Sequence, residues 1–67
     1  MAKTIKLNKN FYEIKAINMA VTAYKGIAEI MVSEASDEYE LKITKTNYDV
    51  NMVELELCNY ILAVMNK

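Results

Sequence analysis

The segment IAEIMVSEASDEYELKIT, residues 27–44, decides the fold, because it contains two runs of alternating apolar and polar side chains around a short polar stretch. Residues 27–33 and 38–44 each alternate with a period of two, which is typical of strands buried on one face. The stretch between them, Glu34 to Asp37, has the length of a hairpin loop. The segment therefore predicts two antiparallel strands joined by a hairpin.

A further strand and a helix are expected before this hairpin. Apolar and polar side chains alternate over residues 4–8, which predicts a strand. Asn10 stands three residues before Glu13, the spacing of a capping box, and predicts the start of a helix over residues 11–24. Gly26, the single glycine of the chain, is placed to end this helix in the left-handed conformation.

A second helix is expected after the hairpin, because Asn51 and Glu54 repeat the capping-box spacing and an apolar pattern continues close to the C-terminus. The predicted order is β-α-β-β-α in a single domain, residues 1–67. A right-handed β-α-β crossover followed by a hairpin puts strand 38–44 in the middle of a three-stranded sheet, with both helices on one face. The expected fold class is α+β, a two-layer sandwich.

The face of the sheet away from the helices is expected to meet water. Met31 is the exception, since it is apolar and falls on this face. The other outward positions are polar and are occupied by Thr4, Lys6, Glu38, Glu40, Lys42 and Thr44.

The composition argues against several classes of function. The chain has no histidine, no arginine, one glycine and one cysteine, Cys58. The usual zinc and copper ligand sets cannot form without histidine, the thiol has no imidazole to activate it, and one glycine cannot build a phosphate-binding loop. We therefore expect no cofactor, no metal site and no catalytic residue, hence no enzyme. The net charge of −1 leaves no basic face, so nucleic acid is not an expected partner.

Secretion and membrane insertion are not expected either. The first residues lack the apolar stretch of a signal peptide, and the longest apolar run, Tyr60 to Met65, is too short to cross a bilayer. A single unpaired thiol is compatible with a reducing compartment. The expected location is the cytoplasm.

Both helices carry more apolar surface than one face of a three-stranded sheet requires. Each has an apolar arc of about 220°, against about 100° for an ordinary surface helix. On the first helix, the stripe expected to lie on the sheet contains Ile14, Ile17, Val21 and Tyr24.

The arc of the second helix has two halves, and two explanations for its width stay open. Either the helices cover each other, or the excess binds another polypeptide. One half of the arc contains Leu55, Cys58, Leu62 and Met65. The other half is selected as the expected partner interface, with Tyr60 as its anchor, and consists of Val53, Leu57, Tyr60, Ile61 and Val64.

Two stretches resemble a known family. They are YEIKAI at residues 12–17, followed by Ala20 and Tyr24, and LCNYIL at residues 57–62. They are similar to the small D component of the His-Xaa-Ser peptide-maturation cassettes, whose members accompany radical S-adenosylmethionine enzymes that modify a ribosomally made peptide. The resemblance implies an accessory or peptide-handling role without catalysis of its own.

Two functions are expected on these grounds. The first is a non-catalytic accessory module that binds a protein or peptide, either a modifying enzyme or its peptide. The alternative is a self-contained homodimer with a structural or small-ligand-binding role, in which the same helix or an unpaired strand edge meets its symmetry mate.

Overall fold

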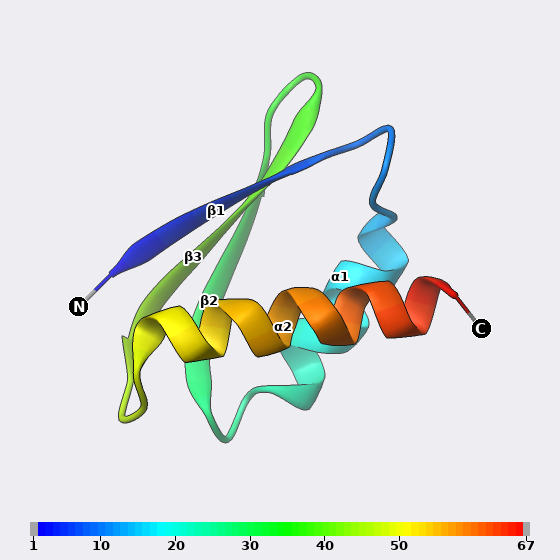
Figure 1. Cartoon of the computed structure of the whole chain (residues 1–67). Helices are drawn as coiled ribbons and strands as arrows, with labels where there is room; N and C mark the ends of the chain where they lie inside the picture. The colour runs from blue at the N-terminus through cyan, green and yellow to red at the C-terminus, as the bar shows by residue number, and fades with distance from the viewer. Residues whose placement is uncertain (1, 67) are drawn as a thin grey trace.

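The hairpin forms the centre of the fold. The structure, a computed structural model, describes residues 2–66. Within this range the elements follow the order β1 (Lys3–Asn8), α1 (Ile14–Ala23), β2 (Ala28–Glu34), β3 (Glu38–Thr46) and α2 (Val50–Met65). β2 and β3 pair antiparallel, and the loop that joins them projects away from both helices (Figure 1). The predicted α+β class and β-α-β-β-α order are confirmed.

β3 is the central strand of an antiparallel sheet with the order β1-β3-β2, as predicted. Leu41 pairs with Ile5 of β1 on one side and with Val32 of β2 on the other. Ile43 pairs with Ile30 of β2. Directly paired residues point to the same face of a sheet, so this register gathers the apolar side chains of the strands into one layer.

β3 continues to Thr46, two residues beyond its predicted end. The pairing of β2 with β3 shifts between Glu29 and Ile30, an irregularity that the alternating pattern did not reveal. The hydroxyl of Thr44 donates to the carbonyl of Glu29 at 3.3 Å, and the hydroxyl of Thr46 donates to the carbonyl of Ile27 at 2.8 Å. These bonds hold the end of β3 against the start of β2, close to where α2 begins.

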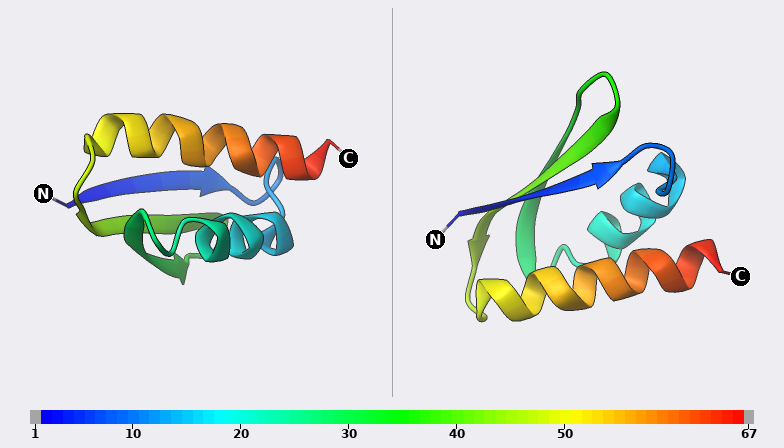
Figure 2. Two further views of the ribbon diagram at one scale, coloured as in Figure 1. Left: turned by 90° about the horizontal axis from the view of Figure 1, so that it is seen from below. Right: turned by 45° about the horizontal axis from the view of Figure 1, so that its top comes forward.

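The core lies between the sheet and the two helices. α1 and α2 run in opposite directions on the same side of the sheet (Figure 2). The opposite sheet face is open: Thr4, Lys6 and Lys42 are exposed, and so is Met31, which agrees with the predicted polar face. The buried side chains are Ile5, Leu7, Ala16, Ile17, Ala20, Ala28, Leu41, Ile43, Val53, Leu57 and Ile61.

The predicted capping box of α1 is wrong. α1 begins at Ile14, three residues later than expected, and the side chain of Glu13 at its N-cap accepts no capping hydrogen bond. Asn8 organises the preceding turn instead: its carbonyl accepts from the amides of Phe11 and Tyr12, and its side chain accepts from the amide of Asn10 at 2.7 Å. Because Asn8 already binds these amides, the chain turns before it becomes helical.

The second capping box is also wrong, because Asp49 caps α2. Its carboxylate accepts from the amides of Asn51 and Met52, at 2.8 and 3.4 Å. The side chains of Asn51 and Glu54 have another role, since both accept from the ammonium group of Lys3, at 2.6 and 2.5 Å. They tie the start of β1 to the first turns of α2.

The left-handed cap predicted at Gly26 is absent. Gly26 does not have a positive φ. α1 ends earlier, where the amide of Tyr24 donates to the carbonyl of Ala20 at 3.0 Å. The carbonyl of Tyr24 then accepts from the amides of Ile27 and Ala28, both at 2.9 Å, so the chain reaches β2 through turns that any residue can adopt.

α1 is rotated about its axis from the predicted position. Ile14, expected on the sheet, is 38% exposed, whereas Ala16 and Ala20 are almost fully buried. Of the predicted stripe, Ile17 lies in the core, and the partly buried Val21 and Tyr24 pack against it. The small alanines face the interior because the interior also contains α2, which approaches most closely where side chains are short.

Candidate functional site

The predicted partner interface lies mostly inside the protein. Val53, Leu57 and Ile61 are 3%, 0% and 0% exposed, and they form the face of α2 that packs on the sheet. The prediction of an accessible surface at these three positions is wrong. The apolar arc was correctly recognised, but the half that meets the sheet was assigned to the partner.

Tyr60 and Val64, the other two predicted interface residues, lie at the edge of the core. Val64 is partly buried against it. The ring of Tyr60 packs edge-on against the ring of Tyr24, with centroids 5.8 Å apart and an interplanar angle of 79°. Burial, followed by the charge of Glu56 and by Tyr60, raises the pKa of the Tyr24 hydroxyl above its ordinary value. Tyr60 therefore packs α2 against the end of α1, and its side chain is 38% exposed.

The most exposed apolar side chains of α2 are two from the half of the arc that was not selected, Leu55 and Leu62, together with Met52, which belonged to neither half. Met52, Leu55 and Leu62 are 55%, 63% and 41% exposed. At 100° per residue, Leu55 and Leu62 lie about 160° and 140° around the helix axis from Leu57. They therefore point almost directly away from the sheet.

These residues form a continuous line along α2. Met52, Leu55, Asn59 and Leu62 follow one another at intervals of three, four and three, which is the spacing of a helix–helix seam. We call these four residues the outer stripe. Asn59 is exposed like the others and is the polar member of the stripe. The spacing was present in the sequence, but the prediction did not separate it from the equally apolar core face.

α1 also carries exposed apolar side chains. A shallow depression beside Tyr60 includes Ile14 and Met19 of α1 in its lining. Met19 is 46% exposed and Ile14 38%. The outer side of the helical layer is thus partly apolar across both helices, whereas the open face of the sheet is mainly polar.

Cys58 flanks the outer stripe and is half-buried. Burial, followed by the charge of Glu54, raises the pKa of its thiol above the ordinary value. The group is consequently a neutral thiol at neutral pH, and a neutral thiol is a poor nucleophile and a poor metal ligand. This chemistry agrees with packing as the role of Cys58.

Neither a metal cluster nor a membrane-spanning helix is present in the part of the chain that the structure describes. Between residues 2 and 66, no group of three or more acidic or cysteine side chains is arranged to hold a metal ion. Over the same range, no helix has the length and apolar character needed to cross a bilayer.

Comparison with known proteins adds no relative from which a role could be transferred. No protein-family model, no curated protein and no solved structure matches the chain.

Proposed function

We propose that this protein is a non-catalytic binding module that holds another polypeptide on the outer stripe of α2. The observation that carries the proposal is the exposure of Met52, Leu55 and Leu62 on one line of a helix whose opposite side is already buried. Burying a large apolar side chain contributes about 1.5–3 kcal/mol, so covering these side chains would contribute substantially to the free energy of binding. Their seam-like spacing suits an apolar α-helix as the segment that is bound.

The size of the stripe favours a partner other than a second copy paired through α2 alone. α2 has 16 residues and is about 24 Å long, so one face covers roughly 300 Å². A standard interface buries about 800 Å² on each partner. A partner that also covers Ile14 and Met19 of α1 comes closer to that area, and a different polypeptide is free to extend in that direction.

A specific biological setting follows from the resemblance of residues 12–17 and 57–62 to the small D component of His-Xaa-Ser cassettes. In that setting the module would be an accessory subunit in the maturation of a ribosomally made peptide, and its partner would be the modifying enzyme or the peptide. This part of the proposal depends on the resemblance alone. A gene for a radical S-adenosylmethionine enzyme beside the gene for this chain would support it.

Site-specific photo-cross-linking tests the proposal. A photoreactive phenylalanine analogue is introduced at Leu55 or Leu62 in cells that make the natural protein, and the adducts are identified by mass spectrometry. The matched control is Met31, which is 65% exposed on the open face of the sheet. We expect one discrete polypeptide adduct from positions 55 and 62 and none from position 31. Equal labelling at all three positions, or no adduct at any, would contradict the proposal.

One observation favours a homodimer as a second candidate. Asn59 lies in the middle of the outer stripe, and a single asparagine at such a seam position is known to specify pairing of two like helices. Light scattering on the purified chain separates the candidates. A mass near twice the 7.7 kDa of the chain supports the homodimer, and a mass of one chain supports the module with a separate partner.

A further inference from the structure

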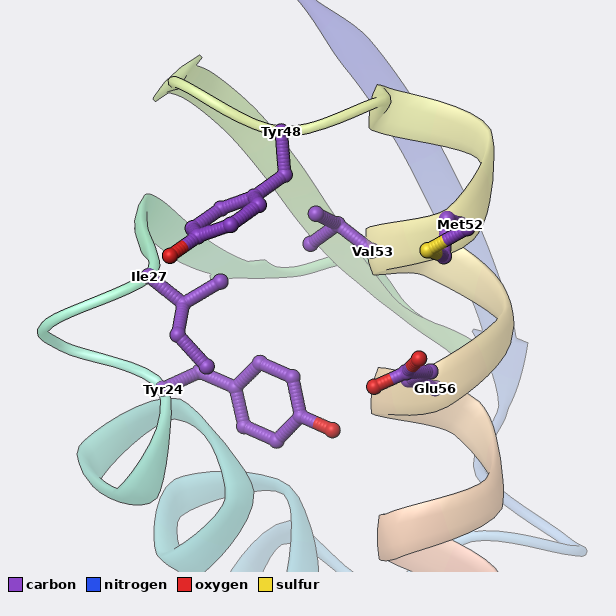
Figure 3. A pocket seen from close by; sticks show the side chains of 6 residues that line it. All are labelled: Tyr24, Ile27, Tyr48, Met52, Val53 and Glu56. Atoms are coloured by element: carbon purple, nitrogen blue, oxygen red, sulfur yellow. The ribbon is translucent and has the colours of Figure 1, made fainter.

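A second concave region borders the N-terminal end of the outer stripe, at Met52. It forms where the end of α1, the turn before β2, the loop before α2 and the first turns of α2 meet (Figure 3). Its volume is about 290 Å³, close to the lower end of the range for small-molecule sites, about 300–1,000 Å³. We call it the tyrosine cup, and its lining consists of Tyr24, Ile27, Tyr48, Met52, Val53 and Glu56.

Apolar and aromatic groups make up the wall of the cup. Val53 is 3% exposed and belongs to the core beneath it. Ile27 is 38% exposed, and Tyr48 and Met52 are 61% and 55% exposed, so the wall is open to a ligand. In Figure 3 the ring of Tyr48 and the side chain of Ile27 approach each other at one end of the cup.

The polar groups of the cup are one carboxylate and one neutral hydroxyl. The carboxylate of Glu56 and the hydroxyl of Tyr24 point into the same space (Figure 3). Within residues 2–66, Glu56 belongs to no ion pair, although the three ion pairs of this range engage other carboxylates. The lining contains no lysine. The cup therefore offers one negative charge beside the hydroxyl of Tyr24, with the ring of Tyr48 at its opposite end (Figure 3).

We propose that the tyrosine cup binds a small organic ammonium ion, whose charged nitrogen pairs with Glu56 and whose apolar body packs on Tyr48 and Ile27. Charge complementarity selects this class, because a carboxylate attracts an ammonium group and repels an anion. The volume suits a single ring or a short alkyl chain. This site shares Met52 with the outer stripe, but the inference does not depend on the proposed polypeptide-binding function.

A matched set of three probes tests the chemistry. Benzylamine, benzyl alcohol and benzoate share one ring and differ in charge, and their binding to the ¹⁵N-labelled chain is followed by the amide signals of the cup. We expect benzylamine to bind about fivefold or more tightly than benzyl alcohol, and benzoate to bind more weakly than both. N-acetyl-lysine amide is a fourth probe, which separates two sources of the ammonium group. Tighter binding than benzylamine indicates that the natural ligand is a lysine side chain, and weaker binding indicates a free amine.

Two variants make the test specific. Glu56→Gln keeps the shape of the side chain and is expected to abolish the preference for benzylamine while benzyl alcohol binds as before, which also shows that the wall is intact. Glu29→Gln on the opposite, exposed sheet face is the control and is expected to keep the preference. Equal binding of benzylamine and benzyl alcohol to the natural chain, a preference that survives Glu56→Gln, or no shift of the cup signals with any probe would overturn the proposal.

Discussion

Replacement of Leu57 by alanine tests the rotational position of α2, on which the assignment of its core face and of the outer stripe depends. Leu57 is 0% exposed. Its shortening removes three carbon atoms from the core, which costs about 2.4 kcal/mol at about 0.8 kcal/mol for each methylene group. The cavity that remains raises the cost to about 3–5 kcal/mol. The free energy of unfolding of a 67-residue domain is about 3–10 kcal/mol, so this single change removes a large share of it.

Leu55→Ala is the matched control, because it makes the same change in the same helix two residues away. Leu55 is 63% exposed. Only about a third of its transfer free energy is realised in the fold, which gives a cost of about 0.8 kcal/mol. The gain in helix propensity from leucine to alanine is the same at both positions and cancels in the comparison.

Urea unfolding followed by far-ultraviolet circular dichroism measures both variants. We expect the midpoint of Leu57→Ala to fall well below that of Leu55→Ala, with a difference in unfolding free energy of at least about 2 kcal/mol. A Leu57→Ala chain that fails to fold beside a folded Leu55→Ala chain agrees with the reasoning. If the two variants lose equal stability, or Leu55→Ala loses more, the assignment of the core face and the outer stripe of α2 is wrong.

The remaining predictions concern the helix ends and the two groups with raised pKa values. Gly26→Ala should leave stability unchanged or raise it by about 0.4–1 kcal/mol, since φ is not positive and an added Cβ meets no atom within 4 Å. Clear destabilisation in a thermal melt would instead support a left-handed conformation at Gly26. Asp49→Ala should cost about 0.5–2 kcal/mol in urea unfolding, more than Asn10→Ala, because Asp49 and not Asn10 caps a helix. Burial, more than the charge of Glu54, raises the pKa of Cys58 above 9.0, so iodoacetamide should alkylate this thiol more slowly in the folded chain than in urea at the same pH. The thiol of Cys58 and the hydroxyl of Tyr24 both ionise more readily in the unfolded chain, so their contribution to the stability of the fold is complete below pH 9 and is lost as the pH rises through the folded-state pKa values. The urea midpoint should therefore decrease as the pH is raised above 9. A midpoint that stays constant there would contradict the assignment.

The sheet was predictable because apolar and polar side chains alternate over the paired segments, with Met31 as the exception. The outward residues of β1 and β3 are polar and the inward ones apolar, so a one-residue slip would expose Ile5, Leu41 and Ile43 together. The topology followed from chain order and loop length. The extension of β3 to Thr46 was not predictable, because it depends on a shift in pairing and on threonine hydroxyls that reach across to β2.

The helix ends were harder to predict because several polar residues competed for each cap. Near α1, Asn8 and Asn10 could both accept amide protons, and the strand end at Asn8 decided the outcome. Near α2, Asp49 and Asn51 stood two residues apart. Asp49 took the amides while Asn51 turned to Lys3, a contact across 48 residues that local spacing does not encode.

Asn59 of α2 and Asn66, the residue after its last turn, contained the signal that would have placed the candidate site correctly. Asn59 and Asn66 lie about 20° apart around the helix axis, at 100° per residue, and both are exposed. The side opposite Asn59 contains Leu57 and Ile61, which must therefore face the sheet, and the apolar residues beside Asn59 are left as the outer stripe. A buried asparagine without a partner costs about 1–3 kcal/mol. A polypeptide that covers the stripe must therefore offer a hydrogen bond at Asn59, which makes the same residue a source of selectivity among otherwise similar apolar helices.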